Sequence, residues 1–367
     1  ESTRVKNDGT IKVGENSTGI YGIYKDGTRK FEGSGSGAKN KLEITTTTNS
    51  KINLGNNSTG MYLVNAQKLD NLGGEIKSTT GATKNVGIYA LNGAIGEAAY
   101  DKDVNYNILT MNNKANITLS DGSVGIFSRG KGTETADRNI VTNTGNIDFS
   151  TGIGNVGIYS IKGGNANNTG NITVGKTLEI STPTVSDPTK TTTYYAIGMA
   201  AGYTPESGTG YTGNITNAGT INVNGDGGSI GMYGTERGTR VINNGTINLR
   251  ANNSVGMYLD NGAYGENNGT IQTIGSGLKK VTGVVIKNGS RFKNNGTVRL
   301  DAESAIGLLT KGNSAGVNPG IIENYGTLDI KGVGAKRTQE STGTDPLEKE
   351  MGGVAIKTPK NSSTSQI

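Results

Sequence analysis

Hydrophobic and polar residues alternate along the chain in short runs that return at a nearly constant spacing. In the stretch Asn243–Leu259, which reads NNGTINLRANNSVGMYL, Ile247 and Leu249 alternate with Thr246 and Asn248. A period of two is typical of a half-buried β-strand, whose side chains point to opposite faces in turn. The first half of the stretch therefore predicts a short strand that follows a turn.

The second half of the same stretch has the same period. Val255, Met257 and Leu259 are expected to share one face, with Gly256 and Tyr258 on the other. A third and weaker strand is expected just before the next asparagine, in segments such as GTRVIN and GSRFKN. Each repeat therefore predicts three short strands.

Two motifs mark the repeats. The first is N-x-G-x-[I/V/L], and the second is a small or β-branched residue followed by Gly, an aliphatic residue and usually Tyr. With degenerate copies included, eleven of each motif alternate along the chain. Strict copies of the first motif begin at Asn7, Asn143, Asn168, Asn217, Asn243, Asn267, Asn294 and Asn324.

The spacing of the second motif gives the length of the repeat. Gly231 and Gly256 are 25 residues apart, and the next two steps are 27 and 24 residues. A period near 25 residues with three short strands fits one coil of a parallel β-helix. The sequence predicts an all-β fold, a right-handed parallel β-helix of about eleven coils, in a single segment over residues 1–367.

The repeated Asn and Gly residues have a mechanical explanation in such a stack. Asn tolerates left-handed backbone at a turn, and stacked Asn side chains can hydrogen-bond from coil to coil. The Gly of the first motif is expected to give the corner backbone freedom. The Gly of the second motif is expected either to relieve crowding under the outward Tyr or to mark a bulge.

The composition fits a long thin core and removes several kinds of chemistry. Of 367 residues, 60 are Gly and only 32% are hydrophobic, and there is no Cys and no His. Disulfides, thiolate catalysis and His-dependent catalysis or metal binding are therefore excluded. The 36 basic residues are scattered, so no stripe for nucleic acid is visible, and no apolar run is long enough for a membrane-spanning helix.

The serial NNGTI and SVGMY repeats of this Cys-free chain resemble the passenger regions of bacterial type V autotransporters. Within that group the resemblance is greatest to the large fusobacterial outer-membrane adhesins of the RadD-like and galactose-binding kinds, and it covers Asn7 to about Ile356. It implies a place on the bacterial cell surface, a parent protein anchored by a C-terminal β-barrel, and a role in adherence. A chain that starts ESTRV, without Met, is expected to be a piece of such a parent.

Departures from the regular repeat mark insertions, where a solenoid usually carries its function. The fourth and fifth of them bracket one copy of the second motif and contain three of the six prolines. Six insertion loops are expected, at about residues 25–50, 92–112, 129–139, 175–193, 201–214 and 331–352.

The paired insertions at residues 175–214 give the candidate binding site. Aromatic rings beside carboxylates suit the recognition of a sugar or a peptide, because they combine a flat apolar face with hydrogen-bond acceptors. As an alternative, Tyr194 and Tyr195 simply lead into the strand YYAIGMA. The candidate ligand-binding residues are Tyr194, Tyr195, Tyr203, Tyr211, Asp187 and Glu206.

A column of aromatic residues in the second motif is another candidate surface. Stacked coils predict an outward aromatic ladder, which either binds a partner or only stabilises the sheet through ring contacts. The column contains Tyr21, Tyr62, Tyr89, Phe127, Tyr159, Tyr233 and Tyr258.

These observations favour a non-enzymatic adhesin segment that binds a surface protein or glycan of a host cell or another bacterium. The carboxylates are dispersed, so no catalytic residue, metal site or cofactor is expected. No nucleic acid partner is expected, and no membrane insertion of this segment. Two alternatives stay open: a secreted β-helical carbohydrate-active enzyme, and a spacer that holds a distal binding tip.

Overall fold

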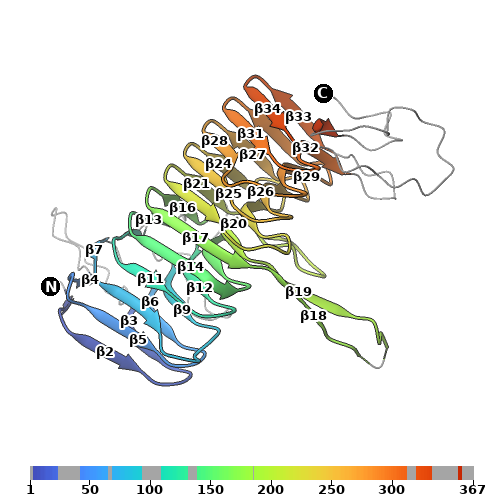
Figure 1. Ribbon diagram of the computed structural model, residues 1–367. Helices are drawn as coiled ribbons and strands as arrows, with labels where there is room; N and C mark the ends of the chain where they lie inside the picture. Colours follow the sequence, from blue (N-terminus) through green and yellow to red (C-terminus); the bar gives the residue numbers. More distant parts are fainter. Residues whose placement is uncertain are drawn as a thin grey trace, which may run out of the picture.

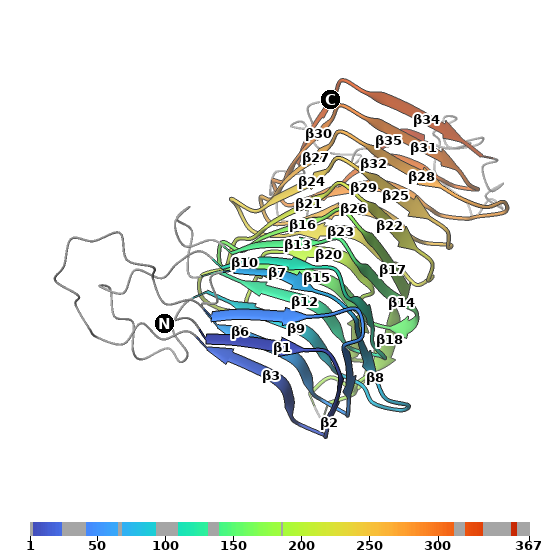
Figure 2. The same ribbon diagram turned by 90° about the vertical axis from the view of Figure 1, so that its left-hand side faces the viewer.

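The computed structural model describes residues 3–23, 42–64, 68–92, 109–130, 139–184, 186–311, 320–332 and 354–357. Within them every regular element is a β-strand, and successive strands wind into an elongated stack of coils (Figure 1, Figure 2). Three parallel sheets of eleven strands run along the stack, and each coil gives one strand to each sheet. The fold is a parallel β-helix, as the repeat predicts; its right-handed sense stays a prediction from the crossover rule.

Sheet A contains the weak third strand of the repeat. From β10 onward each of its strands ends at the motif asparagine, which confirms the predicted position. Its strands are β1 Thr3–Asn7, β4 Leu42–Thr46, β7 Lys68–Leu72, β10 Thr110–Asn113, β13 Ile140–Asn143, β16 Asn165–Asn168, β21 Asn214–Asn217, β24 Arg240–Asn243, β27 Tyr264–Asn267, β30 Arg291–Asn294 and β33 Ile321–Asn324.

Sheet B contains the strand that follows the asparagine and its glycine. Its strands are β2 Thr10–Val13, β5 Lys51–Leu54, β8 Glu75–Ser78, β11 Asn116–Thr118, β14 Asn146–Ile153, β17 Asn171–Lys176, β22 Thr220–Val223, β25 Thr246–Leu249, β28 Thr270–Thr273, β31 Thr297–Asp301 and β34 Thr327–Lys331.

Sheet C contains the second motif. Its strands are β3 Thr18–Ile23, β6 Thr59–Val64, β9 Val86–Leu91, β12 Val124–Arg129, β15 Val156–Ile161, β20 Ile197–Ala201, β23 Ile230–Gly234, β26 Val255–Leu259, β29 Thr282–Lys287, β32 Ile306–Lys311 and β35 Val354–Lys357. A separate antiparallel hairpin consists of β18 Leu178–Ser181 and β19 Thr191–Tyr194.

Two of the predicted insertion loops include residues that form strands of the stack. Strand β4 lies inside the predicted loop 25–50, and β10 overlaps the end of the predicted loop 92–112. Both strands belong to sheet A: β4 alternates apolar and polar residues but ends at Thr46 and not at a motif asparagine, and β10 has one apolar residue, Met111. The rest of four predicted insertions lies outside the described residues, at residues 24–41, 93–108, 131–138 and 333–353.

The core is built from columns of inward side chains that repeat once per coil. In sheet B the same strand position holds isoleucine in nine successive coils that begin at Ile11, and from the second coil onward each of these side chains is at most 1% exposed. Full burial of such a side chain stabilises the fold by roughly 1.5–3 kcal/mol. The column contains Ile11, Ile52, Ile76, Ile117, Ile147, Ile172, Ile221, Ile247 and Ile271.

The motif asparagines form a continuous ladder of side-chain hydrogen bonds along the stack, as predicted. The Nδ2 atom of each ladder asparagine except the last donates to the Oδ1 atom of the asparagine in the next coil at 2.8–2.9 Å. The same Nδ2 also donates to the backbone carbonyl two residues later at 3.1–3.4 Å. The ladder contains Asn113, Asn143, Asn168, Asn217, Asn243, Asn267, Asn294 and Asn324, of which all but the last are 0% exposed.

The ladder asparagines do not use left-handed backbone, contrary to the expectation. They end extended strands of sheet A, and none of them has a positive φ. The described asparagines with positive φ lie at other corners, for example Asn253 at 57° and Asn261 at 52°. The role of the first-motif Asn therefore lies in its side-chain amide, which hydrogen-bonds both to the asparagine of the next coil and to the backbone of its own turn.

The glycine of the first motif is required by close stacking, and the predicted backbone freedom is wrong. A Cβ added to Gly170, Gly219 or Gly245 would lie 2.1 Å from a carbonyl oxygen of the preceding coil. None of the three has a positive φ. Any larger residue would push neighbouring coils apart at this corner.

The glycine of the second motif interrupts the alternation of faces. Val255 is half-buried, whereas Gly256 and Met257 are both buried, so Val255 and Met257 do not share a face as predicted. A Cβ on Gly256 would lie 2.6 Å from Ile271 Cγ2 and 2.5 Å from the carbonyl oxygen of Gly283. The glycine therefore makes room for the core and the next coil, and not for the outward Tyr.

The ladder predicts a large loss of stability when one buried amide is removed. Asn243→Ala removes three side-chain hydrogen bonds and leaves the facing amide groups of Asn217 and Asn267 and the carbonyl oxygen of Gly245 without this partner. We expect the free energy of unfolding to fall by about 2–4 kcal/mol. Urea denaturation followed by circular dichroism measures it.

The neighbouring Asn244 gives a matched control, because it is exposed and accepts one bond, from Asn268 at 2.9 Å. Asn244→Ala is expected to change stability by no more than about 1 kcal/mol. Equal losses for the two variants would contradict a stabilising role for the buried ladder.

Candidate functional site

Two insertions leave the stack from the same coil, on either side of β20. The hairpin of β18 and β19 replaces the corner between β17 and β20, and residues 202–213 join β20 to β21. Figure 1 shows the hairpin projecting away from the stack. The site predicted over residues 175–214 is therefore divided between the two ends of one sheet C strand.

The hairpin carries Tyr194 and Asp187 at opposite ends. Tyr194 ends β19 next to the stack and is 45% exposed. Asp187 lies in the turn, where its Oδ1 accepts hydrogen bonds from the backbone N of Thr189 at 3.0 Å and from its Oγ1 at 2.9 Å. Asp187 thus shapes the turn and does not lie beside the tyrosines, contrary to the prediction.

Tyr203 and Tyr211 face each other across the second insertion. The backbone N of each donates to the carbonyl oxygen of the other, at 2.8 and 2.9 Å, and the rings stack with centroids 6.1 Å apart. Lys162 Nζ lies 4.3 Å from the ring centroid of Tyr211, a cation–π contact. Glu206 is exposed in the turn between the two tyrosines.

The aromatic column lies on the outer face of sheet C and stacks in its first coils. The ring centroid of Tyr62 is 5.6 Å from that of Tyr21 and 4.7 Å from that of Tyr89. The ring centroid of Phe127 continues the stack, 4.8 Å from that of Tyr89. Such contacts stabilise a sheet by themselves. In this part of the chain the structure supports the purely stabilising explanation.

The column changes at β20, where its position is occupied by Ala200. Ala200 pairs with Tyr159 on one side and with Tyr233 on the other. Although it faces outward, Ala200 is only 4% exposed. The Tyr159 ring turns edge-on to Phe127, and its Oη donates to the carbonyl oxygen of Gly202 at 3.1 Å.

The missing ring leaves a surface around Ala200 that five tyrosines share, here named the tyrosine patch. Tyr195 lies between β19 and β20, at the end of β20 where the hairpin leaves the stack. Tyr203 lies in the second insertion at the other end of β20, next to Gly202, whose carbonyl oxygen accepts from Tyr159 Oη at 3.1 Å. Tyr195 is 50% and Tyr203 46% exposed, so the patch presents open aromatic faces.

Two carboxylates stand at the rim of the tyrosine patch. Asp260 directly follows β26, two residues after Tyr258, and its Oδ1 accepts hydrogen bonds from the backbone N of Asn261 at 2.8 Å and from Asn288 Nδ2 at 2.6 Å.

Glu236 is held in a similar way beside the second insertion. Its Oε1 accepts from Thr204 Oγ1 at 2.7 Å and from Asn261 Nδ2 at 2.6 Å. Both rim carboxylates are thus fixed acceptors.

The sequence reasoning found Tyr195 and Tyr203 but not the acids next to them. Asp260 follows Tyr258 by two residues, and alternation along an extended strand places residues two apart on the same face. That spacing was available in the sequence. Glu236 could not be found in this way, because it lies at a turn with a φ of 79°.

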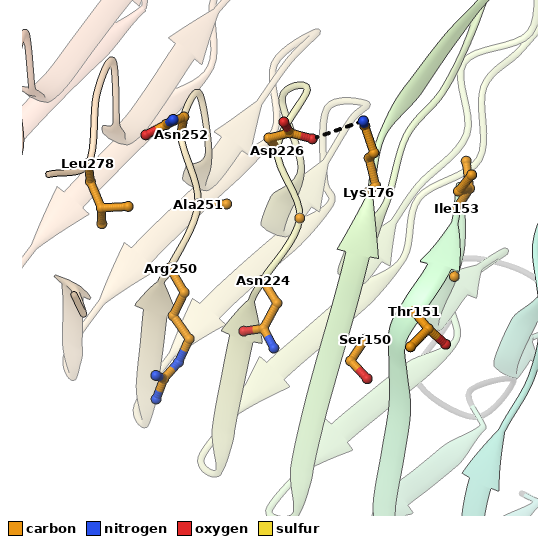
Figure 3. Close-up of a pocket in the computed structure, with 12 residues that line it drawn as sticks. Ser150, Thr151, Ile153, Lys176, Asn224, Asp226, Arg250, Ala251, Asn252 and Leu278 are labelled. Carbon is orange, nitrogen blue, oxygen red and sulfur yellow. Dashed lines mark ion pairs between the residues drawn. The ribbon is translucent and has the colours of Figure 1, made fainter. Parts of the chain in front are cut away.

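A polar groove of about 490 Å³ lies on another side of the stack, where strands of sheet B end. Figure 3 shows the ion pair between Lys176 and Asp226, whose side chains are 3.5 Å apart. Arg250 also lines the groove, and its Nε donates to Asn222 Oδ1 at 3.4 Å. Asp226 is the only carboxylate among the residues that line this groove.

The comparisons with known proteins agree with this architecture. The family model for the third pectate lyase-like domain of BigA matches residues 149–270, about a third of the chain. A search of curated proteins and a search of solved structures each gave no match. The chain is thus a parallel β-helix with a BigA-like stretch, and that stretch contains every residue of the tyrosine patch.

Among the described residues no helix is long and apolar enough to cross a membrane, and no three acidic side chains are grouped so that they could hold a metal ion.

Burial in the tyrosine patch predicts a loss of stability at high pH. Desolvation raises the pKa of Tyr233 and of Tyr258 from the ordinary value near 10 to about 12, and it raises that of Tyr159 further. The folded state then favours the neutral phenol. The stabilisation is complete below pH 10 and is lost as the pH rises from about 10 to 12.

Urea unfolding midpoints measured across this range test the prediction. The double variant Tyr233→Phe, Tyr258→Phe cannot ionise at these positions, so its midpoint should fall less steeply than that of the unmodified chain. Parallel decreases in the two proteins would show that other groups control the high-pH transition.

Proposed function

We propose that this chain is a segment of a bacterial surface adhesin, and that the tyrosine patch binds a glycan of a host cell or another bacterium. One observation carries the proposal. The aromatic column is interrupted at Ala200, and insertions at the two ends of that strand place Tyr195 shortly before it and Tyr203 shortly after it.

The chemistry of the patch supports a sugar as the ligand. Sugar rings have apolar C–H faces that pack on aromatic rings, and their hydroxyl groups donate to carboxylates. Tyr195 and Tyr203 offer the exposed rings, and Asp260 and Glu236 offer acceptors already held by neighbouring donors. Such acceptors lose little freedom when a ligand binds.

The family match supports the adhesin part of the proposal. BigA is an autotransporter-like adhesin, and its domain model covers the coils that carry the patch. By analogy the chain would be exposed on the cell surface as part of an autotransporter passenger attached to the outer membrane. A closer link to the fusobacterial adhesins rests on the repeat sequences alone.

We propose further that the segment is not an enzyme. Glycoside hydrolysis generally needs two carboxylates on either side of the bond that is cleaved. In the polar groove the one lining carboxylate, Asp226, is engaged by Lys176 at 3.5 Å. At the tyrosine patch, Asp260 and Glu236 both accept hydrogen bonds from Asn261, which holds them as acceptors on the same side of the patch and not on either side of a bound sugar. A turnover assay on a panel of polysaccharides tests this part, and release of reducing ends would contradict it.

The binding site is tested with the double variant Tyr195→Ala, Tyr203→Ala. Each ring is expected to contribute about 1 kcal/mol or more, so affinity for bound glycans on an array should fall at least tenfold. Attachment to cells should fall with it.

Tyr325→Ala is the matched control, because Tyr325 is 73% exposed but belongs to a distant coil. Unchanged binding by the patch variant, with its unfolding midpoint preserved, would show that the patch is not the site. Binding by a longer parent protein but not by this segment would favour the spacer alternative.

A further inference from the structure

The hairpin of β18 and β19 forms a sheet of only two strands. Its register pairs Leu178 with Tyr194, Ile180 with Thr192 and Ser181 with Thr191, and no other described strand joins it. Two-stranded hairpins are at best marginally stable in water when nothing covers them. Figure 1 shows that this hairpin extends away from the stack.

The hairpin has one apolar face and one polar face. Paired residues lie on the same side, so Leu178, Ile180 and Tyr194 share a face with Thr192. Ile180 is 42% and Tyr194 45% exposed. The other face is polar, where Thr191 Oγ1 donates to Glu179 Oε1 at 2.5 Å. The apolar face is thus left in solvent.

The ladder also fixes which backbone groups point outward. Thr182 N donates to the carbonyl oxygen of Lys190, so the pair 182–190 is hydrogen-bonded. In an antiparallel ladder such pairs alternate with pairs whose N–H and C=O groups point away from the partner. The backbone groups of Thr191 and Thr193 therefore face the open edge of β19, and those of Glu179 and Ser181 face the open edge of β18.

The two open edges differ in protection. Natural sheets guard an open edge with charged side chains or proline. The edge of β18 carries Glu179, whereas residues 191–195 along β19 read TTTYY and contain no charge. The edge of β19 is thus able to accept another strand.

We propose that the edge of β19 pairs with β19 of a second copy of this chain, in antiparallel orientation centred on Thr192. This register joins two hairpins into one sheet of four strands. The outward backbone groups of Thr191 meet those of Thr193 in the second copy, which gives about four hydrogen bonds.

The side chains match themselves in this register. Thr191 lies opposite Thr193, Thr192 lies opposite its own copy, and Thr–Thr pairs across strands are favourable. Lys190 lies opposite Tyr194, so two equivalent cation–π contacts form on the apolar face. The equivalent pairing along the edge of β18, centred on Ile180, would place Glu179 opposite Ser181 and make the two Glu179 carboxylates diagonal neighbours on one face, roughly 7–8 Å apart, which disfavours that edge.

The contact is small, so the pairing is weak between free molecules. Two short strands paired along one edge bury less accessible surface than the roughly 1,200 Å² that is typical of stable interfaces. Many copies on one surface would strengthen it through their high local concentration. Because the strands are antiparallel, the base of each hairpin lies next to the tip of the other. The two stacks therefore lie at opposite ends of the shared four-stranded sheet.

A disulfide trap tests the register, since the chain contains no cysteine. At the centre of the pairing the two Thr192 positions are directly opposite in a non-hydrogen-bonded pair, where Cα atoms are about 4.5 Å apart and a disulfide can form. Thr192→Cys in a glutathione redox buffer should form covalent dimers at least tenfold faster than Ser181→Cys, which lies on the other edge. Equal rates would overturn the proposal.

Sedimentation velocity over a concentration range up to about 1 mM tests the pairing without a cross-link. Thr193→Pro removes an N–H at the open edge of β19, and Ser181→Pro removes the equivalent group from β18; neither breaks the hairpin ladder. We expect Thr193→Pro to weaken self-association about tenfold or more and Ser181→Pro to leave it unchanged. A monomeric unmodified chain at the highest concentration, or equal effects of the two prolines, would overturn the proposal.

Glycan binding by the tyrosine patch is measured separately and does not depend on this result.

Discussion

Stacking in register is the constraint on which the rest of the molecule depends. Each coil lies directly on the one before it, so a residue must fit its own copy in the next coil. The buried ladder of asparagines satisfies this condition for a polar side chain, because an amide both donates to and accepts from another amide. The glycines satisfy it at the corners, where an added Cβ would lie 2.1 Å from the neighbouring carbonyl oxygen. A chain with few hydrophobic residues can fold because the same positions face inward in every coil.

Much of the fold could be predicted from the sequence for that reason. The period of two located the strands of sheets B and C, and the motif asparagine located the end of each sheet A strand from β10 onward. Strand β4 was missed although LEIT alternates apolar and polar residues, because it ends at Thr46 and not at a motif asparagine, and β10 was missed because TMNN has only one apolar residue. The reasons for the glycines were also missed, since distances between coils do not appear in one repeat taken alone. The face of Val255 was wrong because Gly256 breaks the alternation that the sequence pattern assumes.

The candidate site was only partly visible in the sequence. The insertions around β20 were found, and with them Tyr195 and Tyr203. Their relation to the aromatic column was not, because it depends on Ala200 standing where neighbouring coils have a ring. Asp187 and Tyr194 were grouped as neighbours by sequence distance, but the hairpin holds them at opposite ends. A solenoid thus reveals its scaffold through repetition, whereas its irregular parts must be placed in space before they can be interpreted.

The asparagine ladder also gives the molecule a direction. Between Asn113 and Asn324 all seven amide–amide hydrogen bonds run the same way, from the Nδ2 of one coil to the Oδ1 of the next coil toward the C-terminus. Aligned dipoles of this kind polarise one another, so each added unit strengthens its neighbours. A new coil can join such a chain of dipoles in one orientation only. Duplication of a single repeat within the gene would supply that orientation automatically. A molecule of this design can therefore lengthen during evolution without any change to the hydrogen bonds between neighbouring coils.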